Sequence, residues 1–343
     1  MRRTAFAVLF AFLAALPLAT AQDRVVVVTT TETLRSLAQE VGGDRVEAIS
    51  LSRGIEDPHF IIPTPTLMLK VNDADLFVET GMQLEPWVER VLDGARNSKV
   101  RRGAEGHLDA YEGVERLEVP ASLTRAEGDI HPYGNPHVWL DPLNGKILAA
   151  NIEKGLERVD PAGAETYRAR LADFQRRIDE AFFGRDLIDL VGIEYLERLQ
   201  RSGGLLQFLE ENEMDGTQLA DLLGGWRKSM LPVRGKKFVS YHTTWVYLAA
   251  AFDFEVVETL EPKPGISPTP SHLARVREAI SSHGVRAIFD APYYDLGKAR
   301  TVAEETGISA FQIPSGVGGD EAATDYFRLF DRIAVLLAGA AGG

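Results

Sequence analysis

The sequence predicts an α/β protein with two mostly parallel β-sheets, each in a lobe of its own. Short runs of β-branched and aliphatic residues alternate with helix-like stretches in the first third of the chain and again in the last third. Between these regions lies a stretch whose apolar residues recur with helical spacing. Alternating strands and helices are typical of a parallel sheet covered by helices, and a chain of 343 residues is long enough for two such domains.

The first lobe is predicted over residues 22–143. Its opening run at 24–30 is short, continuous and rich in valine, as expected for a buried strand. Further strands are expected at 46–50 and 75–79, with a helix at 32–41. Ligands usually bind in the loops at the carboxyl ends of such strands.

The middle of the chain is predicted to form a helical linker over residues 144–183. Asp160 and Pro161 have the form of an N-cap followed by proline in the first turn. The apolar residues that follow recur at spacings of 4, 3, 4 and 4, which places them on one face of a helix: Tyr167, Leu171, Phe174, Ile178 and Phe182. This stripe is expected to pack in the core, and its position favours a helix that joins the two lobes.

The second lobe is predicted over residues 184–343, and it begins with an insertion at 184–234 in which glycine pairs separate short helices. The leucines of the insertion indicate packed helices rather than a disordered linker. The alternation then resumes, with strands expected at 237–240, 255–257, 285–289 and 308–313, and helices at 244–252, 271–281, 297–306 and 325–337.

The first 21 residues have the pattern of a secretory signal peptide. A positively charged start precedes an apolar run at 5–16, and Ala19 and Ala21 are the small residues of a cleavage site, so cleavage is expected between Ala21 and Gln22. The apolar run is shorter than the roughly 20 residues that span a bilayer. A lipid anchor requires a cysteine, and the chain has none, so we expect an unanchored protein in the periplasm.

The composition restricts the chemistry of any binding site. A chain without cysteine has no disulfides, thiolate metal ligands or cysteine nucleophiles. Any metal must then be held by histidine nitrogen and carboxylate oxygen. The net charge of −13 argues against nucleic acid and anionic membrane surfaces as partners, and mildly favours cations.

Three of the seven histidines stand where α/β proteins build binding sites. His59 lies in the loop after the strand at 46–50, His137 in a proline-bounded loop before a helix, and His242 directly after the strand at 237–240. A single histidine in such a place is more often a hydrogen-bonded surface or core residue. Together the three indicate a metal site, although their spacing alone does not show that the side chains meet.

Short motifs over nearly the whole chain carry a resemblance to a known family. The most specific is the segment Asn-Pro-His-Val-Trp-Leu-Asp-Pro at 135–142. The others occur in the family's order: 54–59 with Pro63 and Pro65, 74–75, Gly81 with 84–87, 241–242 with Trp245 and Tyr247, and Glu261 with 265–266. By these motifs the sequence resembles the zinc- and manganese-specific solute-binding proteins of ABC importers, the cluster A-I or TroA-like family.

The resemblance implies two α/β lobes joined by one long helix, with the metal in the cleft between the lobes. It maps the first three metal ligands onto His59, His137 and His242. Manganese-selective members have glutamate at the third position, so His242 favours zinc as the cargo and leaves manganese as the alternative, because imidazole suits zinc and manganese prefers oxygen. The resemblance also implies a monomer without enzymatic activity whose partners are a divalent metal ion and an importer permease in the inner membrane.

The fourth ligand departs from the family pattern. Family members commonly supply an aspartate from the loop after the last strand, where this chain has Ser315. The fourth position is then left to water or to another carboxylate. Asp290 is the first candidate, followed by Asp320 and Glu56, and a strand-end cap or a supporting role is an equally good interpretation of Asp290.

Two loops also depart from the pattern. Zinc-binding members often carry a long histidine-rich loop before the second ligand, whereas this chain has only His131 there. The insertion at 184–234 is longer than the family usually needs, and we expect it to add packing. The histidines at 107, 272 and 283 are expected to be ordinary surface residues.

Two other functions remain compatible with the sequence. Three histidines and an open fourth position also describe a hydrolytic zinc site, in which a bound water is the nucleophile. Glu56 and Asp290 are the carboxylates that such a site would use as a base. The second alternative is a periplasmic binder of an organic ligand or a metal chelate, although such a site would not require three histidines in these loops.

Overall fold

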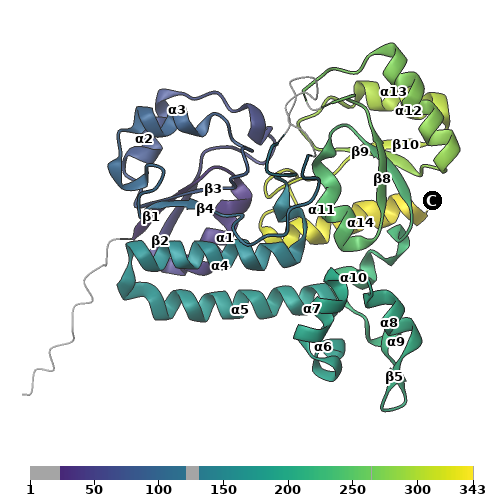
Figure 1. Ribbon diagram of the computed structural model, residues 1–343, viewed down its shortest axis with the longest axis horizontal. Coiled ribbons are helices and arrows are strands. Elements are labelled where there is room, and N and C mark those ends of the chain that lie inside the picture. The colour runs from purple at the N-terminus through teal and green to yellow at the C-terminus, as the bar shows by residue number, and fades with distance from the viewer. Residues whose placement is uncertain (1–23, 121–130, 264, 343) are drawn as a thin grey trace, which may run out of the picture.

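The computed structural model describes residues 24–120, 131–263 and 265–342. In these residues the chain forms two α/β lobes, each built on a four-stranded parallel sheet flanked by helices (Figure 1). The fold class predicted from the sequence is therefore confirmed. The predicted signal peptide at 1–21 lies outside the described residues. None of the helices in these three segments is long and apolar enough to cross a membrane.

The N-terminal lobe contains a sheet with the strand order β2-β1-β3-β4. Its parallel strands are β1 Val25–Thr29, β2 Val46–Ser50, β3 Leu76–Glu79 and β4 His107–Asp109. The first three agree with the predicted strands to within one residue at each end. Strand β4 was not predicted, because it has only three residues and two of them are polar, so it carries no periodic signal.

Neighbouring side chains of this sheet point to opposite helical layers. Val27 packs in the large core that includes α1, Glu32–Gly42. Val28 packs on the other face, against α2, Pro65–Asn72, and α3, Val88–Ala95. Burial on both faces explains why the strand reads as a continuous apolar run rather than an alternating one.

The C-terminal lobe contains a sheet with the strand order β10-β9-β7-β8. Its parallel strands are β7 Lys237–Ser240, β8 Glu255–Thr259, β9 Ala287–Asp290 and β10 Ser309–Gln312. Its helices are α11 Val246–Phe252, α12 Pro270–His283, α13 Leu296–Thr306 and α14 Tyr326–Gly342. All eight elements were predicted, with ends that differ by up to several residues.

The helical linker consists of two helices rather than one. Helices α4, Pro142–Val159, and α5, Ala164–Phe183, are joined by a 3-10 turn and pack along each other beneath the N-terminal lobe (Figure 1). Helix α5 then carries the chain toward the second lobe, which makes it the connecting helix that the resemblance implies. Most of its predicted stripe is fully buried: Tyr167, Phe174, Ile178 and Phe182, with Leu171 partly covered.

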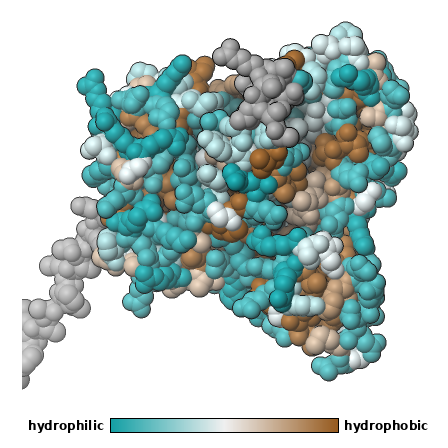
Figure 2. All heavy atoms as spheres, in the orientation of Figure 1, coloured by the Kyte–Doolittle hydropathy of each residue, from teal (hydrophilic) through white to brown (hydrophobic). Residues whose placement is uncertain are grey.

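The insertion folds into packed helices below the C-terminal lobe, as predicted (Figure 1). Leu187 and Leu196 are fully buried inside it. Figure 2 shows hydrophobic residues at the surface over this region, where Tyr195 and Met214 are exposed. Its elements are α6 Arg185–Val191, α7 Ile193–Arg201, α8 Leu205–Glu211, β5 Glu213–Met214, β6 Thr217–Gln218, α9 Leu219–Leu222 and α10 Gly225–Ser229.

Candidate metal centre

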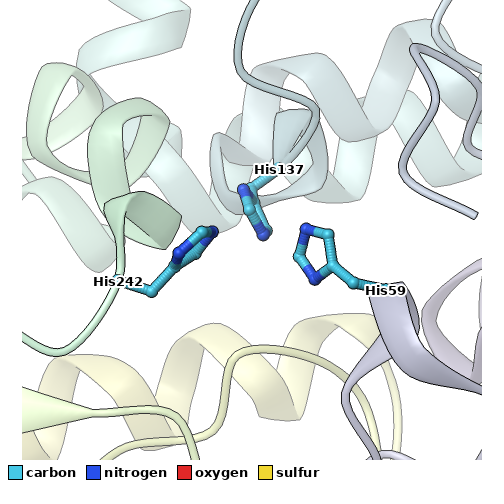
Figure 3. A group of neighbouring side chains, drawn as sticks. All are labelled: His59, His137 and His242. Atoms are coloured by element: carbon cyan, nitrogen blue, oxygen red, sulfur yellow. The ribbon is translucent and has the colours of Figure 1, made fainter. Parts of the chain in front are cut away.

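The three histidines singled out from the sequence meet between the two lobes (Figure 3). His59 lies in a 3-10 turn, Pro58–Phe60, in the loop after β2, and the Asp57 carboxylate caps this turn by accepting from the His59 amide at 3.0 Å. His137 ends the loop before a second 3-10 turn, and His242 follows β7. Three loops that are distant in sequence therefore supply one imidazole each.

The three imidazole rings form a compact triangle. The ring centroids are 5.2 Å apart for His59 and His137, 5.4 Å for His59 and His242, and 5.5 Å for His137 and His242. One nitrogen from each ring lies within 4.8 Å of the other two. His137 is fully buried and His242 is nearly so, while the His59 side chain is 10% exposed. The site is therefore largely shielded from solvent.

Each ring is held at its Nδ1 by a side-chain oxygen. These oxygens accept hydrogen bonds, so each Nδ1 carries the hydrogen and each Nε2 carries a lone pair. The contacts thus set both the tautomer and the orientation of the rings. The pairs are Asp57 with His59 at 2.6 Å, Asn135 with His137 at 2.9 Å, and Glu261 with His242.

The Nε2 atoms of the same three rings are buried and have no hydrogen-bonding partner in the described parts of the chain. A buried polar atom without a partner costs roughly 1–3 kcal/mol, and most such atoms in native proteins are satisfied. Figure 3 shows the rings turned toward one another, so the three lone pairs meet in one place. This is the donor set of a metal ion with imidazole ligands.

The protonation states of His137 and Asp57 favour the binding of a cation. Burial, followed by the neighbouring His59 and His242, lowers the pKa of His137 well below its ordinary value, so its ring is neutral at pH 7. Burial raises the pKa of Asp57, but its contacts with His59 outweigh this effect and lower the pKa overall. A neutral ring offers its lone pair, and a charged carboxylate favours positive charge next to it.

Two tryptophans hold the histidine loops against the scaffold. Trp87 Nε1 donates to the carbonyl oxygen of Pro58 at 2.7 Å, directly before the first histidine. Trp139 Nε1 donates to the carbonyl oxygen of Ser315 at 2.7 Å and connects the loop of the second histidine to the C-terminal lobe. Both tryptophans belong to the motifs noted in the sequence, and these contacts give them a structural role.

A cavity of about 800 Å³ opens beside the triangle and is lined by His59, His131 and His242. The ring centroid of His131 is 5.2 Å from that of His59. Burial and the neighbouring His59 and His242 lower the pKa of His131 to about 3. His131 is not part of the group whose ligand atoms lie within 4.8 Å of one another, so its imidazole stands next to the site as a fourth ring.

The carboxylates considered for the fourth position have different surroundings. Asp290 ends β9 and is fully buried, its oxygens have no hydrogen-bonding partner within the described segments, and burial raises its pKa to about 7. Glu56 pairs with Arg53, and Asp320 pairs with Arg332. The structure groups the three histidines, and the group does not include Asp290.

The oxygens that hold the rings were not identified from the sequence. Asp57 and Asn135 have a local signal, because each stands two residues before a histidine and reaches both its amide and its Nδ1. Glu261 was noted as part of a family motif, but its pairing with His242 has no local signal, because the two residues are 19 positions apart along the chain.

Three histidines were predicted to be surface residues, and this prediction is wrong for two of them. His272 is buried, and its Nε2 lies 2.7 Å from the carbonyl oxygen of Thr259. The side chain of His107 is only 5% exposed, because it lies on the unpredicted strand β4. His283 is exposed, as expected.

Two parallel-sheet lobes with a helical linker and three convergent histidines define a two-lobed metal-binding protein. The chain belongs to the family described as zinc-uptake complex component A, periplasmic (ZnuA), which matches residues 27–182 and 216–340. The resemblance to a TroA-like substrate-binding protein of a metal ABC transporter is therefore confirmed. The part left unmatched between these ranges includes most of the helical insertion.

The relatives are named for different metals. The chain is 31% identical to the iron-binding protein YfeA of Yersinia pestis, over 44% of this chain and 45% of that protein. It is 24% identical to the zinc-binding lipoprotein AdcA of Streptococcus pneumoniae, over 84% of this chain and 49% of that protein. The matched part is thus about half the length of each of these relatives.

Among solved structures, the crystal structure of ZnuA is similar to this chain with a TM-score of 0.68 at 20% identity. The likeness covers 93% of this chain and 99% of that one. At this identity it shows the shared fold.

Replacing Glu261 with alanine leaves Nδ1 of His242 without its carboxylate, so the ring loses its fixed tautomer and orientation. Because such partners typically contribute 10–100-fold to metal affinity, we expect a loss of about 10–100-fold for a Zn²⁺ probe in competition with a chromophoric chelator. Glu261→Gln keeps an acceptor oxygen and should recover much of the loss. The exposed Glu255 provides the control, and equal affinities of Glu261→Ala and Glu255→Ala would contradict this role.

Proposed function

We propose that this protein captures Zn²⁺ in the periplasm and delivers it to the permease of an ABC importer. The observation that carries the proposal is the set of three buried Nε2 atoms that converge between the lobes without hydrogen-bonding partners in the described residues. One metal ion would satisfy all three atoms and would connect ligands from both lobes. Metal binding would then favour one arrangement of the lobes, which gives a permease a way to recognise the loaded carrier.

Zinc is the cargo that this ligand set suits best. Three imidazoles in a chain without thiolates make a nitrogen-rich site. Zn²⁺ takes nitrogen ligands with tetrahedral geometry, whereas Mn²⁺ prefers oxygen. Manganese-selective members of the family that the sequence resembles have glutamate where this chain has His242. Manganese is therefore the alternative that an experiment must exclude.

For the fourth position we propose Asp290, with a water molecule as the alternative. Asp290 is buried and ends β9, which pairs with β7, and His242 follows the end of β7. Because Asp290 lies outside the group of three histidines, its carboxylate would reach the metal only after a shift of the loops around the site.

Capture rather than hydrolysis is favoured by the contacts of the surrounding carboxylates. A zinc hydrolase needs a general base within hydrogen-bonding reach of the metal-bound water. Asp57 and Glu261 are engaged by ligand Nδ1 atoms, and Glu56 is engaged by Arg53. Asp290 is the carboxylate left for such a role, and turnover of esters, phosphates or lactams by the zinc-loaded protein would favour the hydrolase instead.

The location and the partner rest on two further points. The signal peptide predicted at 1–21 supports export to the periplasm, and the family to which the chain belongs supports an ABC importer as partner. We propose that the exported protein acts as a monomer and that the inner-membrane permease recognises its metal-loaded form.

Removing any one of the three ligands should abolish tight zinc binding. We expect one tight Zn²⁺ per chain in the wild type and an affinity at least about 100-fold lower in His59→Ala, His137→Ala and His242→Ala, a loss larger than that caused by outer partners. The exposed His283 provides the control, and equal affinity in all four alanine variants would rule the site out.

In the same titration, a loss of about tenfold or more in zinc affinity in Asp290→Asn would support a carboxylate as the fourth ligand. An unchanged affinity would assign the fourth position to water.

Metal selectivity should depend on His242. A ligand that binds only the folded state at 100 times its Kd stabilises by about 2.7 kcal/mol, so zinc should raise the melting temperature of the wild type much more than manganese at equal concentration. His242→Glu should narrow the difference, because a carboxylate suits manganese better than imidazole does. Equal stabilisation of the wild type by both metals would refute the zinc assignment while leaving the family assignment intact.

Zinc affinity should fall with acidity, because protons and zinc compete for the same Nε2 atoms. The lowered pKa of His137 means that this ring is already neutral at pH 7 and needs no deprotonation. As the pH falls, His137 is protonated in the unfolded chain at about pH 6.5, before it is protonated in the folded chain. The folded protein without metal should therefore also lose stability below that pH. Zinc titrations from about pH 8 to about pH 4.5 test this, and an unchanged affinity would show that histidines are not the ligands.

A further inference from the structure

A second cluster of metal-type side chains lies in the N-terminal lobe. Glu79 is the last residue of β3 and Asp109 is the last residue of β4, and the two are direct neighbours across this parallel pair. His107 stands two residues before Asp109 on β4, so its side chain points to the same face of the sheet. An imidazole and two carboxylates therefore share one end and one face of the sheet.

Three atoms of this cluster are buried and lie close together: Glu79 Oε1, His107 Nε2 and Asp109 Oδ1. His107 Nε2 lies 2.8 Å from Glu79 Oε1, and Asp109 Oδ1 has no hydrogen-bonding partner among the residues described. One ligand atom from each residue lies within 4.8 Å of the other two. Glu79 is 2% exposed and the His107 side chain is 5% exposed. His107 Nδ1 donates to the carbonyl oxygen of Val100 at 3.0 Å, so its Nε2 faces the carboxylates. In the three-histidine site each ring is likewise held at Nδ1, with Nε2 directed toward the other ligand atoms.

Arg102 is the cation that contacts this cluster. Its guanidinium lies 2.8 Å from a Glu79 oxygen and 3.6 Å from an Asp109 oxygen, and it also contacts Glu89. One guanidinium thus faces three carboxylates. Burial and the charge of Glu79 raise the pKa of Asp109 even with Arg102 beside it. The Arg102 side chain is 45% exposed, so it has room to swing toward solvent with Glu89.

The contact between His107 and Glu79 marks the place that a cation would occupy. His107 Nε2 and Glu79 Oε1 lie 2.8 Å apart, so one hydrogen lies between the imidazole and the carboxylate. A divalent cation would replace this proton and supply more positive charge to the same atoms.

We propose that Glu79, His107 and Asp109 form a second binding site for a divalent cation. One imidazole nitrogen and two carboxylate oxygens are ligands that zinc accepts. This site should be weaker than the three-histidine site, because the metal must displace both a proton and the guanidinium of Arg102.

The two sites open into one cavity. Glu79, Arg102 and Asp109 line the same space of about 800 Å³ as His59 and His242. A metal ion at the second site stays next to the space from which the three-histidine site is filled, so the second site acts as a holding position for cargo. This role rests on the proposed function, whereas the existence of the site does not.

Zinc stoichiometry tests the proposal. Equilibrium dialysis of the purified, metal-free protein against Zn²⁺ should give two bound ions per chain, the second at least about tenfold weaker. His107→Gln and Asp109→Asn should each remove the weaker ion and keep the tight one, and retention of the tight ion also shows that these variants fold. Glu112→Gln changes an exposed carboxylate near Asp109 and should keep both ions.

The variant His137→Ala separates this proposal from the proposed function, because it should lose the tight ion and keep the weaker one. NMR spectra give a second readout. The ring signals of His107, assigned by their absence in His107→Gln, should shift in the wild type only with the second equivalent of Zn²⁺. One zinc ion per chain at saturation would overturn the proposal. A second ion that both His107→Gln and Asp109→Asn leave unchanged would also overturn it, and the cluster would then be an ion-pair network.

Discussion

The hydrogen bonds at the three Nδ1 atoms are the constraint on which the metal centre depends. By accepting from Nδ1, the oxygens of Asp57, Asn135 and Glu261 direct three Nε2 lone pairs toward one place. Without these contacts each ring would be free to rotate and to exchange tautomers. With them, the fold holds three buried acceptors that have no partner among the described residues, and each costs roughly 1–3 kcal/mol in that state. A metal ion bound at the proposed site would remove this cost and would link ligands from the two lobes.

Parallel sheets explain why such distant residues meet. All carboxyl ends of a parallel sheet lie at one edge, so the loops that follow the strands converge. His59 comes from the loop after β2 in one sheet, and His242 follows β7 in the other. The contact between Trp139 and the carbonyl oxygen of Ser315 ties the loop of the remaining histidine to the second lobe. The three histidines are therefore supplied and positioned by both lobes together.

The same geometry produces the second cluster. Neighbouring strands β3 and β4 end with Glu79 and Asp109 side by side, and like charges directly opposite each other on a sheet are destabilising. A cation must offset this repulsion. Arg102 does so in part from a half-exposed position, and a divalent ion is able to do so from inside the cavity. Both clusters consist of polar atoms that strand ends place together and that the described protein groups leave incompletely satisfied.

Features that depend on neighbours along the chain were determined by the sequence. The valine run of β1 reveals burial through its continuity, and the stripe with Phe174 on α5 reveals it through its periodicity. His59, His137 and His242 were identified by residue type and flanking motifs. Only the tertiary structure decided the rest. Strand β4 is too short and too polar for a periodic signal, so the burial of His107 was missed. The pairing of Glu261 with His242 was missed for a related reason, because it joins two strand ends whose proximity depends on the pairing of β7 with β8. Local patterns report which side of an element is buried, whereas the partners of a buried polar atom are set by how distant elements pack.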